Sequence, residues 1–135
     1  QNKFDRAIAL RPGDLELLKQ LGRDLLALKQ PEAALRYLQM ALDLNPGDLA
    51  ALFGAGEIAG RLGRYEQAIA HFRQTVAHHP DDPQSWYFLG LGLSSSGKQA
   101  EAEKALCRSL ELSGTDDKLR NKTQRLLTAL QENLQ

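Results

Sequence analysis

Three prolines set a strict spacing along this chain. Pro12, Pro46 and Pro80 stand 34 residues apart, and the stretch that each one closes has the same order of apolar residues. A fixed period of this length indicates an array of stacked supersecondary units, because each unit buries its apolar face against its neighbours. The period predicts three consecutive units, at residues 15–48, 49–82 and 83–116.

Within each unit the apolar residues recur three and four positions apart, which is the period of an α-helix. In the third unit one face carries Trp86, Leu89 and Leu93, and the second half continues with Ala102 and Leu106. The alternation typical of a strand is absent from the sequence. The whole chain is therefore predicted to be all-α.

Each unit breaks once in its middle and once at its end. Gly63 and Gly97 share the mid-unit position, where glycine suits the left-handed residue after a helix end. Lys29-Gln30-Pro31 fills that place in the first unit. Between units, a proline is followed by an aspartate that can cap the next helix. Each unit is thus predicted to hold two antiparallel helices joined by short turns.

The units resemble the tetratricopeptide repeat, which has a 34-residue period with W-x2-L-G-x2-Y in its first helix and A-x3-F in its second. The matches are Trp86-x2-Leu89-Gly90, Leu18-x2-Leu21-Gly22 and Leu52-x2-Ala55-Gly56, followed by Ala34-x3-Leu38, Ala68-x3-Phe72 and Ala102-x3-Leu106. The resemblance implies a right-handed superhelical solenoid of antiparallel helix pairs. It also implies a protein that binds other proteins.

A glycine recurs inside the first helix of every unit. Gly22, Gly56 and Gly90 share one position, although glycine costs a helix about 1 kcal/mol relative to alanine. We expect this position to serve close packing between the paired helices. The small residues that would face the contact are Ala34, Ala68 and Ala102.

The two ends of the chain depart from the repeat. Residues 1–11 fit the second helix of a truncated preceding repeat, so we expect the chain to be a piece of a longer protein. Gly114 stands where a closing proline would be expected. Residues 117–135 have one leucine-rich face and one polar face, which predicts a C-terminal capping helix.

Composition narrows the classes of function. Lys and Arg total 17 and Asp and Glu total 17, so the net charge is zero and no nucleic-acid partner is expected. No apolar run approaches the ~20 residues of a membrane helix, so no membrane insertion is expected. The single Cys107 excludes an internal disulfide and leaves the compartment open.

The resemblance implies a concave groove lined by the first helix of each repeat. Phe53, Tyr87 and Phe88 are aromatics at lining positions that packing between paired helices does not require, and Gly54 would leave room for an inserted side chain. Lys19 and Arg23 would form a basic end for a carboxylate. The predicted partner-binding residues are Lys19, Gln20, Arg23, Phe53, Gly54, Glu57, Gln84, Tyr87, Phe88 and Leu91.

Two alternatives bear on this groove. Phe53 and Tyr87 could instead pack between successive repeats, or be covered by parts of a longer protein. A second question is whether the groove holds chaperone tails, as some family members do through a two-carboxylate clamp. The matching positions are Lys19, Arg23, Gly54, Gln84 and Phe88, and only Lys19 agrees with the clamp. Chaperone tails are therefore not the expected ligand.

No catalytic, metal or cofactor site is expected. His71, His78 and His79 lack a further ligand at metal-binding spacing, and no base is identified for Cys107. The predicted function is a non-enzymatic scaffold that binds a partner peptide in its groove. Two alternatives remain: a docking arm of a larger enzyme such as a transferase, or of assembly machinery, and a homo-oligomer that stacks through an N-terminal edge containing Phe4 and Ile8.

Overall fold

The computed structural model describes residues 15–133, which form seven helices and no strand. These are α2 (Leu15–Ala27), α3 (Pro31–Leu44), α4 (Leu49–Arg61), α5 (Tyr65–His78), α6 (Pro83–Ser95), α7 (Gln99–Ser113) and α8 (Asp117–Asn133). The prediction of an all-α solenoid is confirmed. The predicted half repeat at residues 1–11, with Phe4 and Ile8, lies outside the described residues.

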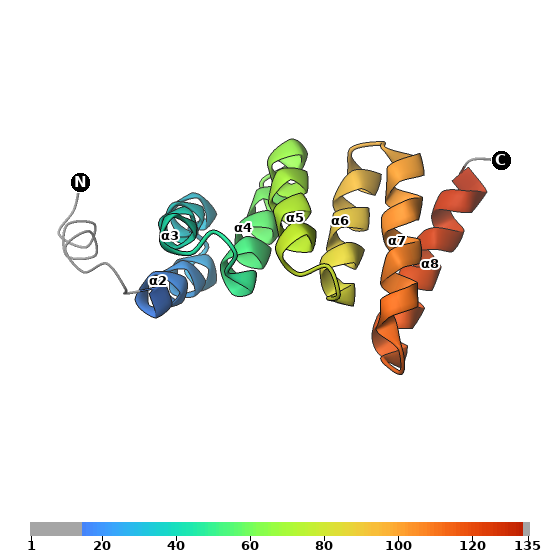
Figure 1. Ribbon diagram of the computed structural model, residues 1–135. Coiled ribbons are helices and arrows are strands. Elements are labelled where there is room, and N and C mark those ends of the chain that lie inside the picture. The colour runs from blue at the N-terminus through green and yellow to red at the C-terminus, as the bar shows by residue number, and fades with distance from the viewer. Residues whose placement is uncertain (1–14, 134–135) are drawn as a thin grey trace.

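The helices follow one another side by side along the array (Figure 1). Each helix packs mainly against the one before it and the one after it, and α6 also contacts α8. The view catches α2 and α3 nearly end-on but α6 and α7 from the side, so the helix axes turn progressively along the array. Helices α2, α4, α6 and α8 follow one another on one side of the array, and we call them the first-helix row.

The turns inside the three units share one backbone conformation. Lys29, Gly63 and Gly97 have positive φ angles of 62°, 76° and 83°. A left-handed residue ends a helix sharply and lets the chain double back. Lysine adopts this conformation at a steric cost that glycine avoids. The three predicted mid-unit turns nevertheless share one geometry, with lysine in the first and glycine in the other two.

The turns between units end in aspartates that cap the following helix. Asp48 accepts a hydrogen bond from the backbone N–H of Ala51 at 3.0 Å, and Asp82 accepts one from that of Ser85 at 3.2 Å. Asp116 does the same for Leu119 at 3.1 Å, at the start of α8. These bonds satisfy N–H groups that the first turn leaves unpaired, so the chain stops and restarts at a fixed place.

The glycines of the first helices allow the paired helices to approach closely. A Cβ atom built on Gly56 would lie 2.7 Å from the Phe72 ring, and one on Gly90 would lie 2.7 Å from Leu106. On Gly22 it would lie 2.9 Å from Leu38. The expected close packing is confirmed, because each large side chain of a second helix fills the space above a glycine.

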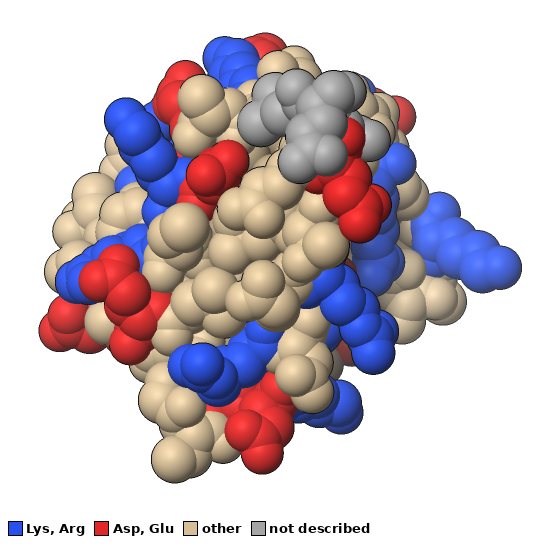
Figure 2. All heavy atoms as spheres, turned by 90° about the vertical axis from the view of Figure 1, so that its right-hand side faces the viewer, with Lys and Arg blue, Asp and Glu red and all other residues tan. Residues whose placement is uncertain are grey.

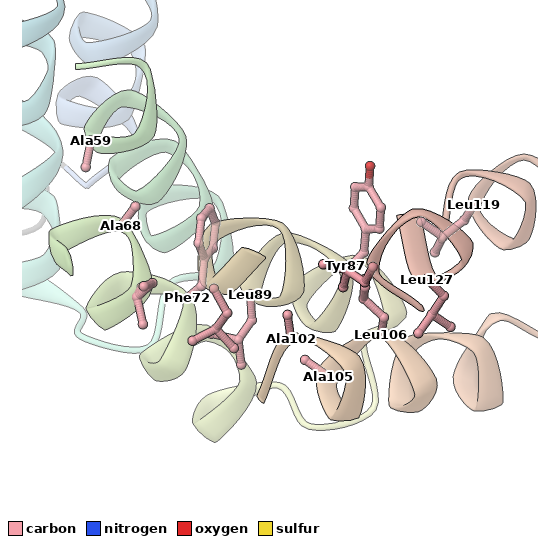
Figure 3. Packing of buried hydrophobic residues seen from close by; sticks show 13 residues of the cluster. Ala59, Ala68, Phe72, Tyr87, Leu89, Ala102, Ala105, Leu106, Leu119 and Leu127 are labelled. Carbon is pink, nitrogen blue, oxygen red and sulfur yellow. The ribbon is translucent and has the colours of Figure 1, made fainter. Parts of the chain in front are cut away.

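Buried alanines, leucines and aromatics form the core between the two rows of helices. Ala68, Ala102 and Leu106 are at most 1% exposed. Figure 3 shows how the cluster continues from Phe72 and Leu89 to Leu119 and Leu127 of α8. This cluster runs from Ala59 at the end of α4 into the last helix, and a separate cluster around Leu18, Leu38 and Ile58 fills the first repeat and most of α4.

Helix α8 closes the C-terminal end of the described array. Leu119, Leu127 and Leu130 are buried, and Leu126 is half-buried. Figure 2 looks onto this end and shows a band of uncharged residues with charged side chains of both signs around it. No helix among residues 15–133 is both long and apolar enough to cross a membrane.

Candidate functional site

Two pockets lie in the first-helix row, one between α2 and α4 and the other between α4 and α6. The α2–α4 pocket has a volume of about 230 Å³, and the α4–α6 pocket has about 380 Å³. Glu57 lines both of them, so they form neighbouring parts of one surface, which we call the groove face. A second helix supplies the floor in each case: Leu38 of α3 in one and Phe72 of α5 in the other.

The α2–α4 pocket contains five of the predicted binding residues. They are Lys19, Arg23, Phe53, Gly54 and Glu57. The space above Gly54 is already taken, because a Cβ atom there would lie 2.9 Å from the Leu38 side chain. The room that the sequence suggested at Gly54 is therefore used by the preceding repeat.

Lys19 is held inside the array by two carboxylates. Its Nζ atom lies 2.9 Å from Oε2 of Glu16 and 3.2 Å from Oδ1 of Asp48, and the residue is only 8% exposed. The hydrogen bond to Glu16 is the main cause that raises the pKa of Lys19, against the opposing effect of burial. The charge of Lys19 is thus balanced within the chain.

Arg23 is the more accessible member of the predicted basic end. It is exposed, and its Nη2 atom donates a hydrogen bond to Oε1 of Gln20 at 2.9 Å. Gln20 in turn donates to Asp24 and lines neither pocket. Because Gln20 is neutral, this hydrogen bond does not offset the positive charge of the Arg23 guanidinium.

The α4–α6 pocket has apolar walls and a polar rim. Phe72, Phe88 and Leu91 supply large apolar groups, and Gly60 leaves one side open, because a Cβ atom there would have nothing within 4 Å. The other lining residues are Gly56, Glu57, Arg61, Tyr65, Ala68, Gly92 and Ser95. A large apolar side chain would find a surface of matching chemistry here.

Three of these lining residues, Tyr65, Ala68 and Phe72, come from α5 and were missed by reasoning restricted to first helices. Phe72 was identified only as a core position, and Tyr65 was not considered. Tyr65 starts α5 and remains 41% exposed, which is unusual for a ring at a helix junction. Its place directly after the left-handed Gly63 turn was the available sequence signal, since that turn brings the start of α5 beside the end of α4.

The predicted aromatics hold one another in place. The ring centroid of Phe53 lies 5.2 Å from that of Phe88, with the planes nearly perpendicular, and Phe72 lies 5.7 Å from Phe88. Such edge and offset contacts stabilise aromatic clusters. Phe53 and Phe88 are half-buried, so both link α4 to α6 and also border the pockets.

Tyr87 lies in neither pocket. It is 9% exposed, burial raises the pKa of its phenol, and Nζ of Lys122 lies 5.0 Å from its ring centroid. Its hydroxyl points away from the buried cluster (Figure 3). Tyr87 therefore packs between successive helices of the first-helix row. This is the alternative to ligand binding that was raised from the sequence. Gln84 is exposed on the first turn of α6 and also lies outside the pockets.

The three histidines contact residues of the preceding repeat. Nε2 of His79 lies 2.8 Å from the carbonyl oxygen of Gly47, and the His78 ring lies over the Cα of the same glycine. His71 lies 3.3 Å from the side chain of Gln39. Within residues 15–133, no three His, Cys, Asp or Glu side chains converge as metal ligands would.

The chain is similar in sequence to known repeat proteins. Two family models described as tetratricopeptide repeat match residues 25–91 and 83–116. The tetratricopeptide repeat-containing protein trd-1 of Caenorhabditis elegans is 29% identical over 93 residues, which are 69% of this chain. The chain spans only 12% of the length of that relative.

Solved structures share the fold at low identity. The Yersinia enterocolitica type III secretion chaperone SycD, in complex with a peptide of the translocator YopD, matches with a TM-score of 0.84 at 22% identity, over 90% of this chain and 95% of SycD. The first repeat domain of Spaghetti (RPAP3), bound to an HSP90 peptide, matches with a TM-score of 0.78 at 19% identity, over 89% of this chain and 92% of that one.

Proposed function

Because this chain belongs to the tetratricopeptide repeat family, we propose that it binds a segment of a partner protein along the groove face. One large apolar side chain of the partner, such as Phe, Trp or Leu, enters the α4–α6 pocket. The chain acts as an interaction scaffold, and no catalytic role is assigned to it.

The α4–α6 pocket is the observation that carries this proposal. Its volume of about 380 Å³ is enough for one large side chain together with neighbouring backbone. Gly60 is the second reason. The glycines at 22, 56 and 90 each make room for a side chain of the paired helix, whereas the space beside Gly60 is empty. An alanine would fit there and favour the helix, so a glycine at this place makes physical sense if a ligand occupies the space.

The remaining predicted residues take graded roles under this proposal. Phe88 and Leu91 contact the apolar anchor, and Glu57, which pairs with Arg61 at 2.9 Å, borders it. Arg23 and Phe53 contact the partner where it passes the α2–α4 pocket. Lys19, Gln20, Gly54, Gln84 and Tyr87 hold the groove in shape or lie beside it.

The two peptide-bound neighbours support this reading by analogy of fold. Both are repeat domains whose described complexes contain a peptide. Their identity to this chain is too low to transfer the peptide itself, and the chain is not proposed to bind either one.

A substitution that fills the pocket tests the proposal. A displayed library of random peptides about 12 residues long would be selected on the full chain and on Gly60→Leu. We expect the wild type to enrich peptides with a large apolar residue, and Gly60→Leu to bind those peptides at least roughly tenfold more weakly. Phe53→Ala is a poorer test, because it also removes the contact with Phe88.

The matched control places a leucine outside the groove. Ala77 is exposed on α5 and lines neither pocket, so Ala77→Leu should bind the selected peptides as the wild type does. Thermal unfolding of both variants checks that the fold persists. If Gly60→Leu bound the peptides as tightly as Ala77→Leu, the α4–α6 pocket would not be the binding site.

A further inference from the structure

We propose that α8 extends the groove face and supplies its basic end, so that the partner segment carries acidic residues on one side of its apolar anchor. Lys118, Lys122 and Arg125 form this end. The inference rests on the proposed binding function and adds the chemistry of the partner.

Helix α8 stands in the phase of a fourth first helix. It begins at Asp117, which lies 34 residues after Pro83 at the start of α6. With the same shift, Lys118, Lys122 and Arg125 occupy the places that Gln84, Phe88 and Leu91 hold in α6. The sequence pattern alone assigned these three side chains to the polar face of a cap.

One contact between neighbouring first helices is repeated between α6 and α8, so α8 faces α6 as α6 faces α4. Phe53 of α4 packs on Phe88 of α6 with ring centroids 5.2 Å apart. One repeat further, Tyr87 of α6 takes the place of Phe53, and Nζ of Lys122 in α8 lies 5.0 Å from its ring centroid. Lys122 therefore stands on the groove face where Phe88 stands one helix earlier.

The three basic residues repel one another within the chain. They are exposed and lie four and three residues apart, so their charges share one side of the helix. No acidic residue occurs three or four positions from any of them. None of the three belongs to an ion pair within residues 15–133. Arg120, on another side of α8, instead donates to the Leu110 carbonyl oxygen.

The other charges on the groove face do not offset this row. Glu57 is paired with Arg61, and Lys19 is shared between Glu16 and Asp48, so the Lys19 cluster carries one net negative charge. Arg23 adds a further cation with a neutral neighbour. The charge left without an ion-pair partner is thus positive, which favours a segment bearing Asp or Glu. Lys118, Lys122 and Arg125 lie one helix beyond the positions that match the carboxylate clamp, and at those positions only Lys19 agrees with the clamp.

The geometry also sets the spacing of the partner's residues. Packed helices lie about 8–10 Å apart, and an extended chain advances about 3.3 Å per residue. The middle of the α4–α6 pocket lies about one and a half such spacings from α8, or roughly 12–15 Å, so the acidic residues should follow or precede the anchor by about four residues.

The test uses the same displayed random library, selected on the full chain and on the double variant Lys122→Gln, Arg125→Gln. The wild-type pool should be enriched in Asp or Glu near the apolar residue. A selected acidic peptide should bind the double variant roughly 5- to 20-fold more weakly, and added salt should weaken wild-type binding. The variant pool should keep the apolar residue and lose the acidic ones.

A matched control removes two positive charges from the second helices. Arg36 and Lys104 are exposed on α3 and α7, and Arg36→Gln, Lys104→Gln should bind as the wild type does. A wild-type pool with apolar residues but no acidic enrichment overturns the role of α8 and leaves the binding function standing. A pool that Gly60→Leu binds equally well shows that the α4–α6 pocket is not the binding site, which overturns the proposed function on which this inference rests. Unfolding of the Lys122, Arg125 variant at or above the wild-type temperature separates lost binding from lost fold.

Discussion

Two glycines of the first-helix row should respond in opposite ways to the same substitution. Gly60→Ala adds a methyl group where nothing lies within 4 Å, and it removes the helix penalty of glycine, so we expect stabilisation by roughly 0.5–1 kcal/mol. Gly90→Ala would bring its Cβ to 2.7 Å from Leu106, which is 0% exposed. We expect a net loss of about 1–2 kcal/mol there.

Urea unfolding followed by circular dichroism measures both values. The two variants act as controls for each other, because each adds one methyl group to a first helix. If Gly90→Ala were as stable as the wild type, Leu106 would have another place to go and the close approach of α6 and α7 would not need a glycine.

His71 should make stability depend on pH. Burial lowers the pKa of His71 below its ordinary value of 6.5. As pH falls below that value, the unfolded chain takes up a proton that the folded chain does not, so stability is fully present above 6.5 and declines below it. Protonation would also require the Gln39 amide to turn, because its nitrogen is assigned as facing Nε2.

The comparison variant for this effect is His71→Gln. Measured by urea unfolding at about pH 7.5 and about pH 5.5, the wild type should lose more stability than the variant between the two conditions. His78 and His79 are present in both proteins, so the comparison isolates the contribution of His71. Equal losses in the two proteins would show that His71 is not the group responsible.

Among the helices, α4 begins at an N-cap residue, Asp48, which also contacts α2. Asp48 caps α4 through the Ala51 N–H and accepts a hydrogen bond from Lys19. Asp48→Asn keeps the cap and loses the charge beside a largely buried lysine, so we expect a cost of about 1–2 kcal/mol. Asp48→Ala loses the cap as well, and we expect about 1 kcal/mol more.

Asp82→Ala provides a comparison for Asp48→Ala, because within residues 15–133 Asp82 caps α6 without a lysine partner; it also accepts a hydrogen bond from the Ser85 hydroxyl, which Asp82→Ala removes. Chemical denaturation of the three variants separates the cap from the ion pair. If Asp48→Asn and Asp48→Ala unfolded at the same denaturant concentration, the hydrogen bond to Ala51 would contribute nothing.

The helices and turns could be predicted from the sequence because their causes are local. Apolar periodicity sets the face of a helix, and Gly63, Gly97 and the capping aspartates act on their own neighbourhood. The solenoid follows from the period, since each helix needs only its neighbours to cover it.

The site could be predicted only in part, because contacts with the adjacent repeat determine where each groove side chain lies. Leu38 reaches the space above Gly54, and Asp48 holds Lys19 from 29 residues away. Tyr87 is mostly buried, and Lys122 of α8 lies over its ring. Such contacts depend on the rotation between repeats, which residue spacing within one repeat does not determine.

In the array as a whole, interactions run from each repeat to the next. Two ion pairs join the second helices at equivalent places, Glu32 with Arg64 at 3.2 Å and Glu66 with Lys98 at 3.4 Å. All four side chains are well exposed, so each pair contributes little. The coupling between repeats must come mainly from buried side chains, and it should therefore be strongest where the core is continuous.

This nearest-neighbour design predicts where a defect at one end is felt. Leu127 of α8 is 3% exposed within the cluster that reaches back to Ala59, and Leu127→Ala should cost about 2–4 kcal/mol. In native-state hydrogen exchange, α7 and α8 should exchange faster, α6 less so, and α2 and α3 at the wild-type rate, because repeat arrays can open from an end. Leu91→Ala, at an exposed position of α6, is the control and should leave α7 and α8 unchanged. Equal acceleration of all seven described helices by Leu127→Ala would instead mean that the array unfolds as one cooperative unit.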